Sequence, residues 1–140
     1  MYLLDTDHLT TLQRGGESAQ RLLTKLAIVS TREIATTVVS YEEQLRGWLS
    51  YIAKSRSIDA QVEAYRQLKN QLKTYCTIPV LEFNPQAAIE FKRLKKAYPR
   101  LGAMDLKIAA IALAKRADLL TRNLSDFGQI ENLSAEDWTA

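Results

Sequence analysis

The sequence has very few of the residues that build soft-metal and nucleophilic sites. Cys76 is the only cysteine and His8 the only histidine among 140 residues. A single cysteine excludes an intramolecular disulfide and a cysteine-rich zinc site, and we expect a partly buried thiol. A single histidine disfavours histidine-rich metal sites and serine-type triads. Any chemistry must then rest on carboxylates, hydroxyls and amides, which suit Mg²⁺ or Mn²⁺.

Long apolar runs are also missing. No stretch is long enough to span a bilayer, and Asp5 interrupts the apolar N-terminus before a signal-peptide core could form. We therefore expect a cytoplasmic protein with no membrane partner. Hydrophobic residues make up 46% and charged residues 25% of the chain, which is typical of a globular protein. The length fits one domain, residues 1–140.

The net charge is small, +3, but the basic residues are unevenly placed. Five of them fall shortly before Asp105: Lys92, Arg93, Lys95, Lys96 and Arg100. A basic strip beside an acidic metal site would suit a polyanionic substrate. The same strip is also what a solvated helix face looks like, and the sequence leaves both interpretations open.

Strand and helix patterns alternate along the chain. Apolar and β-branched runs predict strands at 2–5, 34–39, 80–83 and 118–121, with a short edge strand within 129–138. Helical periodicity predicts helices at 8–13, 17–28, 40–53, 57–75, 85–98 and 104–115. This alternation indicates an α/β fold of three layers, α/β/α, with a central parallel sheet. The helices at 40–75 form a hairpin inserted after the second strand.

Acidic residues follow the strands or open helices at several places: Asp5, Glu42, Glu43, Asp105 and Asp126. In an open α/β sheet, ligands sit beyond the carboxyl ends of the strands, so these side chains are expected at one edge. Two carboxylates ~5 Å apart repel by roughly 3 kcal/mol at an effective dielectric of about 20. A divalent cation removes that penalty, and the pattern therefore predicts a metal-dependent enzyme.

Each acid also has a purely structural interpretation. Asp5 can cap the helix that follows it, and Asp105 can act as a first-turn anion. Ser40 followed by Glu43 is a capping-box pattern. The predicted buried stripe of the same helix passes nearer to Glu42 than to Glu43, and consists of Tyr41, Leu45, Leu49 and Ile52.

Four segments in this order resemble the PIN domain, and in particular the VapC-type toxins of bacterial toxin–antitoxin pairs. They are Leu3-Leu-Asp-Thr-Asp, Ser40-Tyr-Glu-Glu-Gln-Leu-Arg-Gly, Gly102-Ala-Met-Asp-Leu-Lys-Ile-Ala-Ala and Leu120-Thr-Arg-Asn-Leu-Ser-Asp-Phe. The ending, residues 130–138, is also similar to that group. The resemblance implies a PIN-like fold and an Mg²⁺- or Mn²⁺-dependent endoribonuclease that cleaves RNA phosphodiester bonds.

The resemblance also implies site residues. Asp5, Glu43 and Asp105 match the family's acids, as catalytic residues and metal ligands. Where many PIN domains carry a fourth aspartate this chain has Asn123, and Asp126 is expected to substitute. Which of the two fills that position, and whether one or two metals bind, stays open.

Other residues near the acids have supporting roles in this interpretation. Thr6 and Thr121 would hydrogen-bond the acids or metal-bound waters. Arg46 and Arg122 would contact phosphate, or else pair with an acid such as Glu42. We disfavour the neighbouring histidine as a base.

The resemblance implies an RNA substrate, a small antitoxin protein and a homodimer. Trp48, Tyr51 and Tyr65 on the helical hairpin offer an apolar groove for an antitoxin, or simply pack together. Two alternatives remain. One is a catalytically inactive PIN-like binding module. The other is a receiver-type phosphoacceptor domain, which is disfavoured because Phe83-Asn84 follows the third strand and no lysine directly follows Thr121.

Overall fold

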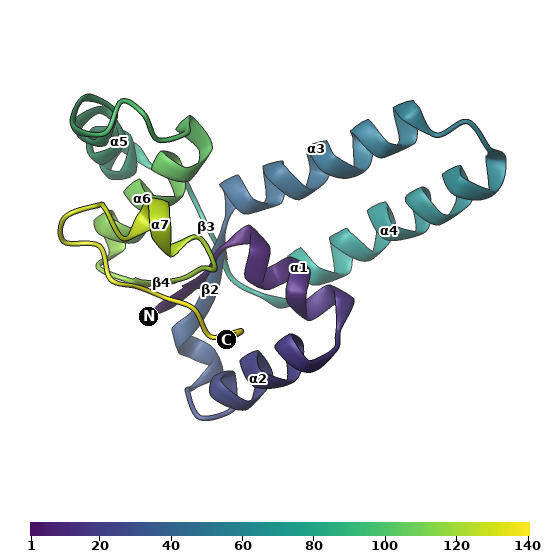
Figure 1. Cartoon of the computed structure of the whole chain (residues 1–140), viewed down its shortest axis with the longest axis horizontal. Helices are drawn as coiled ribbons and strands as arrows, with labels where there is room; N and C mark the ends of the chain where they lie inside the picture. The colour runs from purple at the N-terminus through teal and green to yellow at the C-terminus, as the bar shows by residue number, and fades with distance from the viewer.

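The computed structural model describes residues 1–140 and contains five parallel strands in one sheet, in the order β3-β2-β1-β4-β5 (Figure 1). The strands are β1 (Tyr2–Leu4), β2 (Ile34–Thr37), β3 (Val80–Leu81), β4 (Asp118–Leu120) and β5 (Ala135–Glu136). The helices are α1 (Thr6–Arg14), α2 (Glu17–Leu26), α3 (Val38–Lys54), α4 (Ile58–Thr77), α5 (Pro85–Ala97), α6 (Ala103–Lys115) and α7 (Leu124–Phe127), with a 3-10 turn η1 (Thr31–Glu33).

Alternating leucines on the two central strands divide the core into two layers. Leu3 of β1 and Leu119 of β4 belong to a large apolar cluster beneath α5 and α6. Their neighbours Leu4 and Leu120 point to the opposite face and pack with Leu22 of α2. Successive strand residues face opposite sides, so both faces of the sheet are covered by helices. This confirms the predicted three-layer α/β/α fold.

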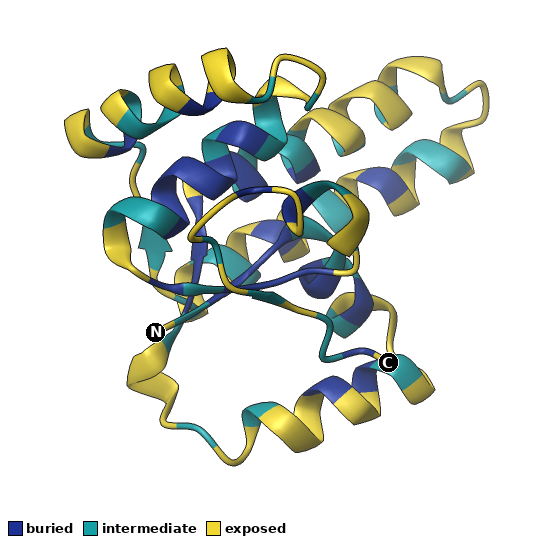
Figure 2. Ribbon diagram, turned by 60° about the vertical axis from the view of Figure 1, so that its left-hand side comes forward, coloured by how far each residue is buried: buried dark blue, intermediate teal, exposed yellow.

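Helix α6 is the most deeply buried helix of the chain (Figure 2). Residues 108–112 are all buried, and three of the five are alanines. Small side chains let α6 lie close to the sheet and to α5. The helix is therefore a rigid support for Asp105 in its first turn.

Helices α3 and α4 form the predicted hairpin, which projects from the sheet (Figure 1). The predicted apolar stripe on α3 is wrong at Leu49, which is 50% exposed. Gln44 is buried instead, donating to Thr10 Oγ1 at 3.1 Å and accepting from Tyr75 Oη at 2.9 Å. The inner face of α3 thus meets α1 and α4 through hydrogen bonds, which helical apolar periodicity does not detect.

The start of α3 also differs from the prediction. The strand ends at Thr37, whose Oγ1 accepts from Ser40 N at 3.1 Å, so Thr37 is the N-cap. Val38 and Val39 are helical despite their β-branched side chains, because Val39 enters the core. The Ser40 capping box is therefore wrong, and Glu43 has no role at the helix N-terminus.

Smaller expectations are resolved elsewhere. Asn84 Oδ1 accepts from Ala87 N at 2.9 Å and so caps α5, which begins at the predicted position, residue 85. Cys76 is exposed rather than partly buried, because it lies on the outer side of α4. Helix α7 was not predicted, since four residues carry no periodicity. None of the helices combines the length and apolar character needed to cross a bilayer.

Candidate active site: an acidic pocket at the carboxyl edge of the sheet

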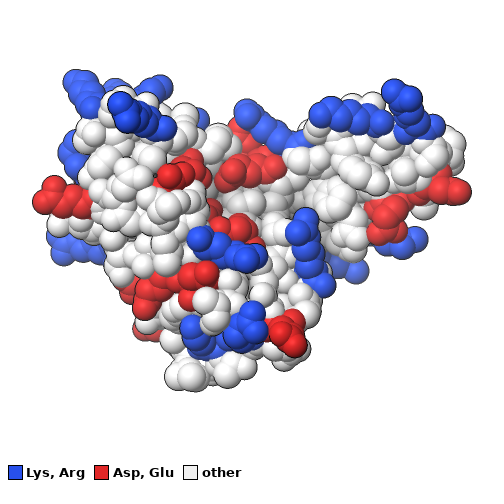
Figure 3. All heavy atoms as spheres, in the orientation of Figure 1, with Lys and Arg blue, Asp and Glu red and all other residues white.

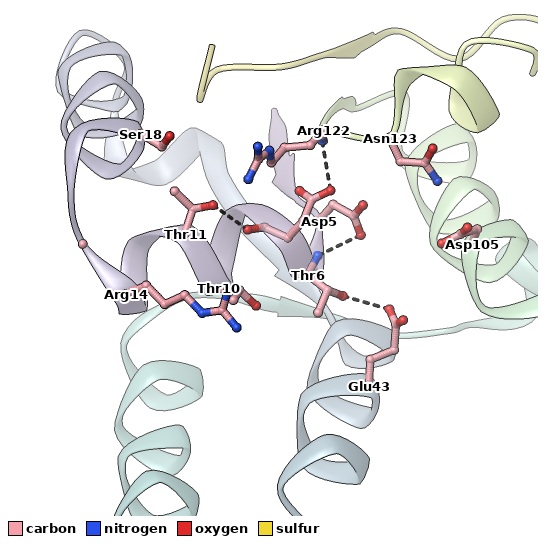
Figure 4. A pocket seen from close by; sticks show the side chains of 12 residues that line it. Asp5, Thr6, Thr10, Thr11, Arg14, Ser18, Glu43, Asp105, Arg122 and Asn123 are labelled. Atoms are coloured by element: carbon pink, nitrogen blue, oxygen red, sulfur yellow. Dashed lines mark hydrogen bonds between the residues drawn. The ribbon is translucent and has the colours of Figure 1, made fainter.

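A pocket of about 530 Å³ opens beyond the carboxyl end of β1 and is lined by no hydrophobic residue (Figure 4). We call it the acidic pocket. Its lining consists of Asp5, Thr6, Asp7, Thr10, Thr11, Arg14, Gly15, Ser18, Glu43, Asp105, Arg122 and Asn123. Figure 3 shows acidic side chains gathered in the central hollow of the molecule, where the hairpin meets the rest of the chain.

Asp5 lies immediately after β1 and is only 6% exposed. Its carboxylate accepts from Thr6 N at 2.8 Å and from Thr121 Oγ1 at 2.7 Å. The expected N-cap role is thus present, alongside a place in the pocket. Burial, followed by repulsion from Asp7, raises the pKa of Asp5 to about 7. The fold therefore holds this carboxyl in an environment that disfavours its charge.

Glu43 reaches the pocket from α3. Its Oε1 accepts from Thr6 Oγ1 at 2.8 Å, which links α3 to the first turn of α1 (Figure 4). Glu42, one residue earlier, pairs instead with Arg46 at 2.6 Å. Of the two neighbouring glutamates, Glu43 is the one that lines the acidic pocket.

Asp105 comes from the buried helix α6, on the side of the pocket opposite α1 (Figure 4). No side chain accepts a hydrogen bond from the free backbone amides at the start of α6. Its N-cap residue is Gly102, and Asp105 does not cap the helix either. Burial raises the pKa of Asp105, and the charges of Glu43, Asp126 and Asp7 add to the effect. Three separate elements thus bring Asp5, Glu43 and Asp105 into one pocket.

Asn123 and Asp126 occupy the remaining corner together. Asn123 lines the pocket, and its Nδ2 donates to Asp126 Oδ2 at 3.1 Å. Asp126 lies behind it on α7 and is close enough to influence the pKa of Asp105. Thr121 sits beneath this corner, accepting from Asn123 N at 3.0 Å while it donates to Asp5. The structure places both candidates for the fourth position near Asp105, with the asparagine in front.

Asp7 is a pocket residue that the sequence interpretation missed. Its Oδ2 accepts from Arg122 N at 3.0 Å, and its Oδ1 lies 2.7 Å from His8 Nδ1. Trp138 N donates to His8 Nε2 at 3.2 Å, so the proton of this buried ring is on Nδ1 and is donated to Asp7. His8 therefore serves as a fixed donor and not as a base. The spacing Asp5-x-Asp7 at a strand end was the available signal.

The structure separates the two interpretations that the sequence left open for Arg46 and Arg122. Arg122 lines the acidic pocket, as does Arg14, which the sequence interpretation did not single out. Arg46 is held by Glu42 and lines no part of the pocket. The basic strip forms an exposed face of α5 and the turn after it, where Arg93 pairs with Glu90 at 2.7 Å, and contributes nothing to the pocket lining (Figure 3).

The donor set of the pocket fits a hard divalent cation. Carboxylate, hydroxyl and amide oxygens line it, and its histidine-free, cysteine-free chemistry suits Mg²⁺ or Mn²⁺. No three acidic, histidine or cysteine side chains converge closely enough to enclose an ion by themselves. An ion held here would keep several waters, as Mg²⁺ usually does. Burial is the largest cause of the raised pKa of Asp5 and of Asp105, and neither side chain forms an ion pair with a basic residue.

Comparison with known proteins agrees with this architecture. Residues 2–132 match the family model described as the PIN domain. Ribonuclease VapC1 of Haemophilus influenzae (strain R2866) is 26% identical over 145 residues, which cover 99% of this chain and 98% of that protein.

Solved structures show the same fold. VapBC2 from Rickettsia felis aligns with a TM-score of 0.74 at 23% identity, covering 98% of each chain. VapBC-1 from nontypeable Haemophilus influenzae aligns at 0.71 and 24% identity, covering 99% of this chain and 98% of that one. A toxin–antitoxin complex from Klebsiella pneumoniae aligns at 0.70 and 22% identity, covering 95% of each. Because the family model spans nearly the whole length, this chain belongs to the PIN domain family.

Proposed function

We propose that this PIN domain is a divalent-metal-dependent endoribonuclease. The observation that carries the proposal is the acidic pocket, where Asp5, Asp7, Glu43 and Asp105 share one polar hollow with Arg14 and Arg122, and neither arginine forms an ion pair with any of the four acids. A similar protein is named as a ribonuclease. Such an arrangement is unfavourable for stability alone, because gathered carboxylates repel, and it is useful when a cation and a phosphate enter together.

The roles of the residues follow from their positions. Asp5 and Asp105 would hold the ion from opposite sides of the pocket, with Glu43 beside them and oriented by Thr6. When bound, a divalent ion activates water and stabilises the leaving oxygen of an in-line displacement at phosphorus. Glu43 would orient the attacking water, since its second carboxylate oxygen makes no hydrogen bond within the protein.

The far corner of the pocket would face the substrate strand or a second ion. Asn123 presents its side chain there and Asp126 supports it, so the two act as one unit. Arg122 would contact phosphate at the rim. Asp7 would reinforce the negative field, held by three donors from His8, Thr121 and Arg122.

The test is cleavage of labelled RNA by purified protein with Mg²⁺, Mn²⁺ or excess chelator. We expect cleavage only with metal, and a loss of at least tenfold in both Asp105→Asn and Glu43→Gln. Asp59→Asn is the matched control, because Asp59 is an exposed acid at the far end of the hairpin. Calorimetric titration with Mn²⁺ gives a second readout, in which Asp105→Asn weakens binding and Asp59→Asn does not. Chelator-resistant cleavage, or full activity of both pocket variants, would refute the proposal. A protein that binds Mn²⁺ and RNA but never cleaves would instead be an inactive binding module.

We also propose that the protein is the toxin of a toxin–antitoxin pair, acting in the cytoplasm as a homodimer. The Klebsiella structure is named as such a complex. On the hairpin, an apolar groove is lined by Tyr41, Leu45, Tyr65, Leu68, Lys69, Gln71 and Leu72, and it suits an apolar segment of a small partner. Co-expression with the product of a short reading frame next to the gene should yield a complex in which cleavage is suppressed. Light scattering of the free protein should give twice the monomer mass.

A further inference from the structure

A second hollow continues from the acidic pocket along the hairpin, between α1 and α3–α4. It measures about 530 Å³ and shares four lining residues with the acidic pocket: Thr6, Thr10, Arg14 and Glu43. Its other lining residues are Gln13, Gln44, Gly47, Trp48, Tyr51 and Gln67. We call this hollow the aromatic groove. Because they share these residues, the aromatic groove and the acidic pocket adjoin each other.

Two aromatic rings form one wall of the aromatic groove. Trp48 and Tyr51 lie edge to face, with ring centroids 6.0 Å apart, and Tyr51 is 48% exposed. Gly47 adds no side chain beside them, and nothing lies within 4 Å of where its Cβ would be. The wall therefore leaves open space next to an aromatic face, which is the setting in which a planar group can stack.

Three glutamines also line the groove, beside the four residues that it shares with the acidic pocket. Gln13 and Gln67 are at the groove surface, where Gln67 Nε2 is bonded to Glu63 at 3.0 Å. Gln44 is tied to Gln13 by bonds of 3.1 and 3.4 Å. Amides offer both donors and acceptors, which match the edges of nucleobases better than they match phosphate.

A cation stands where the two hollows meet. Arg14 lines both, is exposed, and has no carboxylate within 4.0 Å, in contrast to Arg46, Arg66 and Arg93. A free guanidinium suits a phosphate that bridges a reacting nucleotide in the acidic pocket and its neighbour in the aromatic groove.

From these positions we infer that the aromatic groove is a subsite for one unpaired nucleotide next to the scissile phosphate. Its base stacks on the Trp48 ring, which Tyr51 supports edge to face, its edge meets the glutamine amides, and its phosphate is held by Arg14. The inference rests on the proposed function, and it specifies the substrate as a single-stranded segment, because a base-paired nucleotide cannot present its face to a side chain.

The hairpin offers a matched control for this subsite. Tyr65 is 56% exposed but lines the apolar groove on another side of the hairpin and not the aromatic groove. The effect on RNA affinity of removing an exposed aromatic ring can therefore be compared between the aromatic groove and a site outside it on the same hairpin.

The experiment measures RNA binding apart from cleavage, in chelator, by the fluorescence anisotropy of a labelled mixed-sequence single-stranded oligoribonucleotide and of its labelled duplex. In the natural chain, a base stacked on Trp48 should also quench the fluorescence of this tryptophan. The only other tryptophan, Trp138, packs against Tyr2 and not in the groove, so the change in fluorescence can be assigned to Trp48. We expect Trp48→Leu and Tyr51→Leu each to weaken single-strand binding at least fivefold, since stacking is worth about 1 kcal/mol or more per base. Tyr65→Leu should bind normally. Trp48→Phe, which keeps an aromatic face, should restore most of the affinity, and this rescue separates stacking from a folding defect.

Three results would overturn the inference. They are unchanged affinity in both leucine variants, equal affinity for single strand and duplex, and loss of a co-purifying partner protein from Trp48→Leu while RNA binding is unchanged. Its failure is distinguishable from that of the nuclease. If the natural chain cleaves RNA with metal and the leucine variants bind RNA normally, the subsite is wrong and the nuclease proposal stands. If the leucine variants lose RNA affinity but the natural chain never cleaves, the nuclease proposal is wrong and the nucleotide-binding groove stands.

Discussion

Replacing Asp5 by asparagine should stabilise the metal-free protein while abolishing its metal response. Asp5 is buried, and burial and Asp7 raise its pKa from 3.8 to about 7. The native state therefore retains a proton that the unfolded chain releases between about pH 4 and pH 7. Stability falls as pH rises through this window, because the native state binds more protons there than the unfolded state.

The size of the effect follows from that shift. At about 1.36 kcal/mol per pH unit, a rise from 3.8 to about 7 corresponds to an upper limit of about 4 kcal/mol. Asparagine keeps an oxygen to accept from Thr6 N but loses the charge-assisted bond from Thr121, so part of the gain is offset. We expect a net gain of about 1–3 kcal/mol at pH 8, or roughly 3–10 °C in Tm for a chain of this size.

Thermal and urea unfolding of Asp5→Asn and the natural chain, in chelator at pH 4 and pH 8, measure this directly. The two proteins should differ at pH 8 and converge at pH 4. Added Mg²⁺ should then raise the Tm of the natural chain more than that of the variant, since a ligand stabilises the state that binds it. If Asp5→Asn is less stable at pH 8, or if the natural chain shows no loss of stability between pH 4 and pH 7, the electrostatic reasoning is wrong.

Three further changes test other contacts. Thr6→Val removes the hydroxyl that donates to Glu43, and should lower kcat by about tenfold while the Tm changes little, as steady-state cleavage and calorimetry can check. His8→Ala removes a buried ring and its bond from Trp138 N, so it should destabilise by about 2–4 kcal/mol and expose the Trp138 amide to hydrogen exchange, and normal protection would contradict that linkage. Thr37→Ala removes the cap of α3 and should lower the unfolding free energy by about 1 kcal/mol in urea, whereas Ser40→Ala keeps the backbone amide that Thr37 caps and should cost clearly less, and an equal loss in both variants would contradict the assignment of the cap.

The order of elements and the layering were predictable because they depend on periodicity and on short strong signals. The helices at 85–98 and 104–115 were expected from the sequence, and α5 (Pro85–Ala97) and α6 (Ala103–Lys115) begin within one residue of the predicted positions. The residue at which a helix begins was less predictable. Thr37 and Ser40 are both good caps, and only the tertiary packing of Val39 decides that the helix starts at the earlier one.

The same reason explains the outcome for the site. The acids that follow strands could be grouped from the sequence, because parallel strands end at one edge. The resemblance to the PIN domain pointed to Glu43, but helical periodicity did not, because the hydrogen bond that holds Glu43 in the pocket comes from Thr6, 37 positions away. Asp7 was missed although it stands two residues after Asp5 at a strand end, whereas Arg14 lies at the far end of α1, where no pattern within the helix shows that it borders the pocket.

The most direct measurement is anomalous diffraction from crystals of the protein soaked in Mn²⁺. We expect an anomalous peak in the acidic pocket, within bonding distance of Asp5 or Asp105. The peak should be absent from crystals of Asp105→Asn. A pocket without a peak at saturating Mn²⁺, or an ion bound only elsewhere, would contradict the claim that these acids converge to hold a metal.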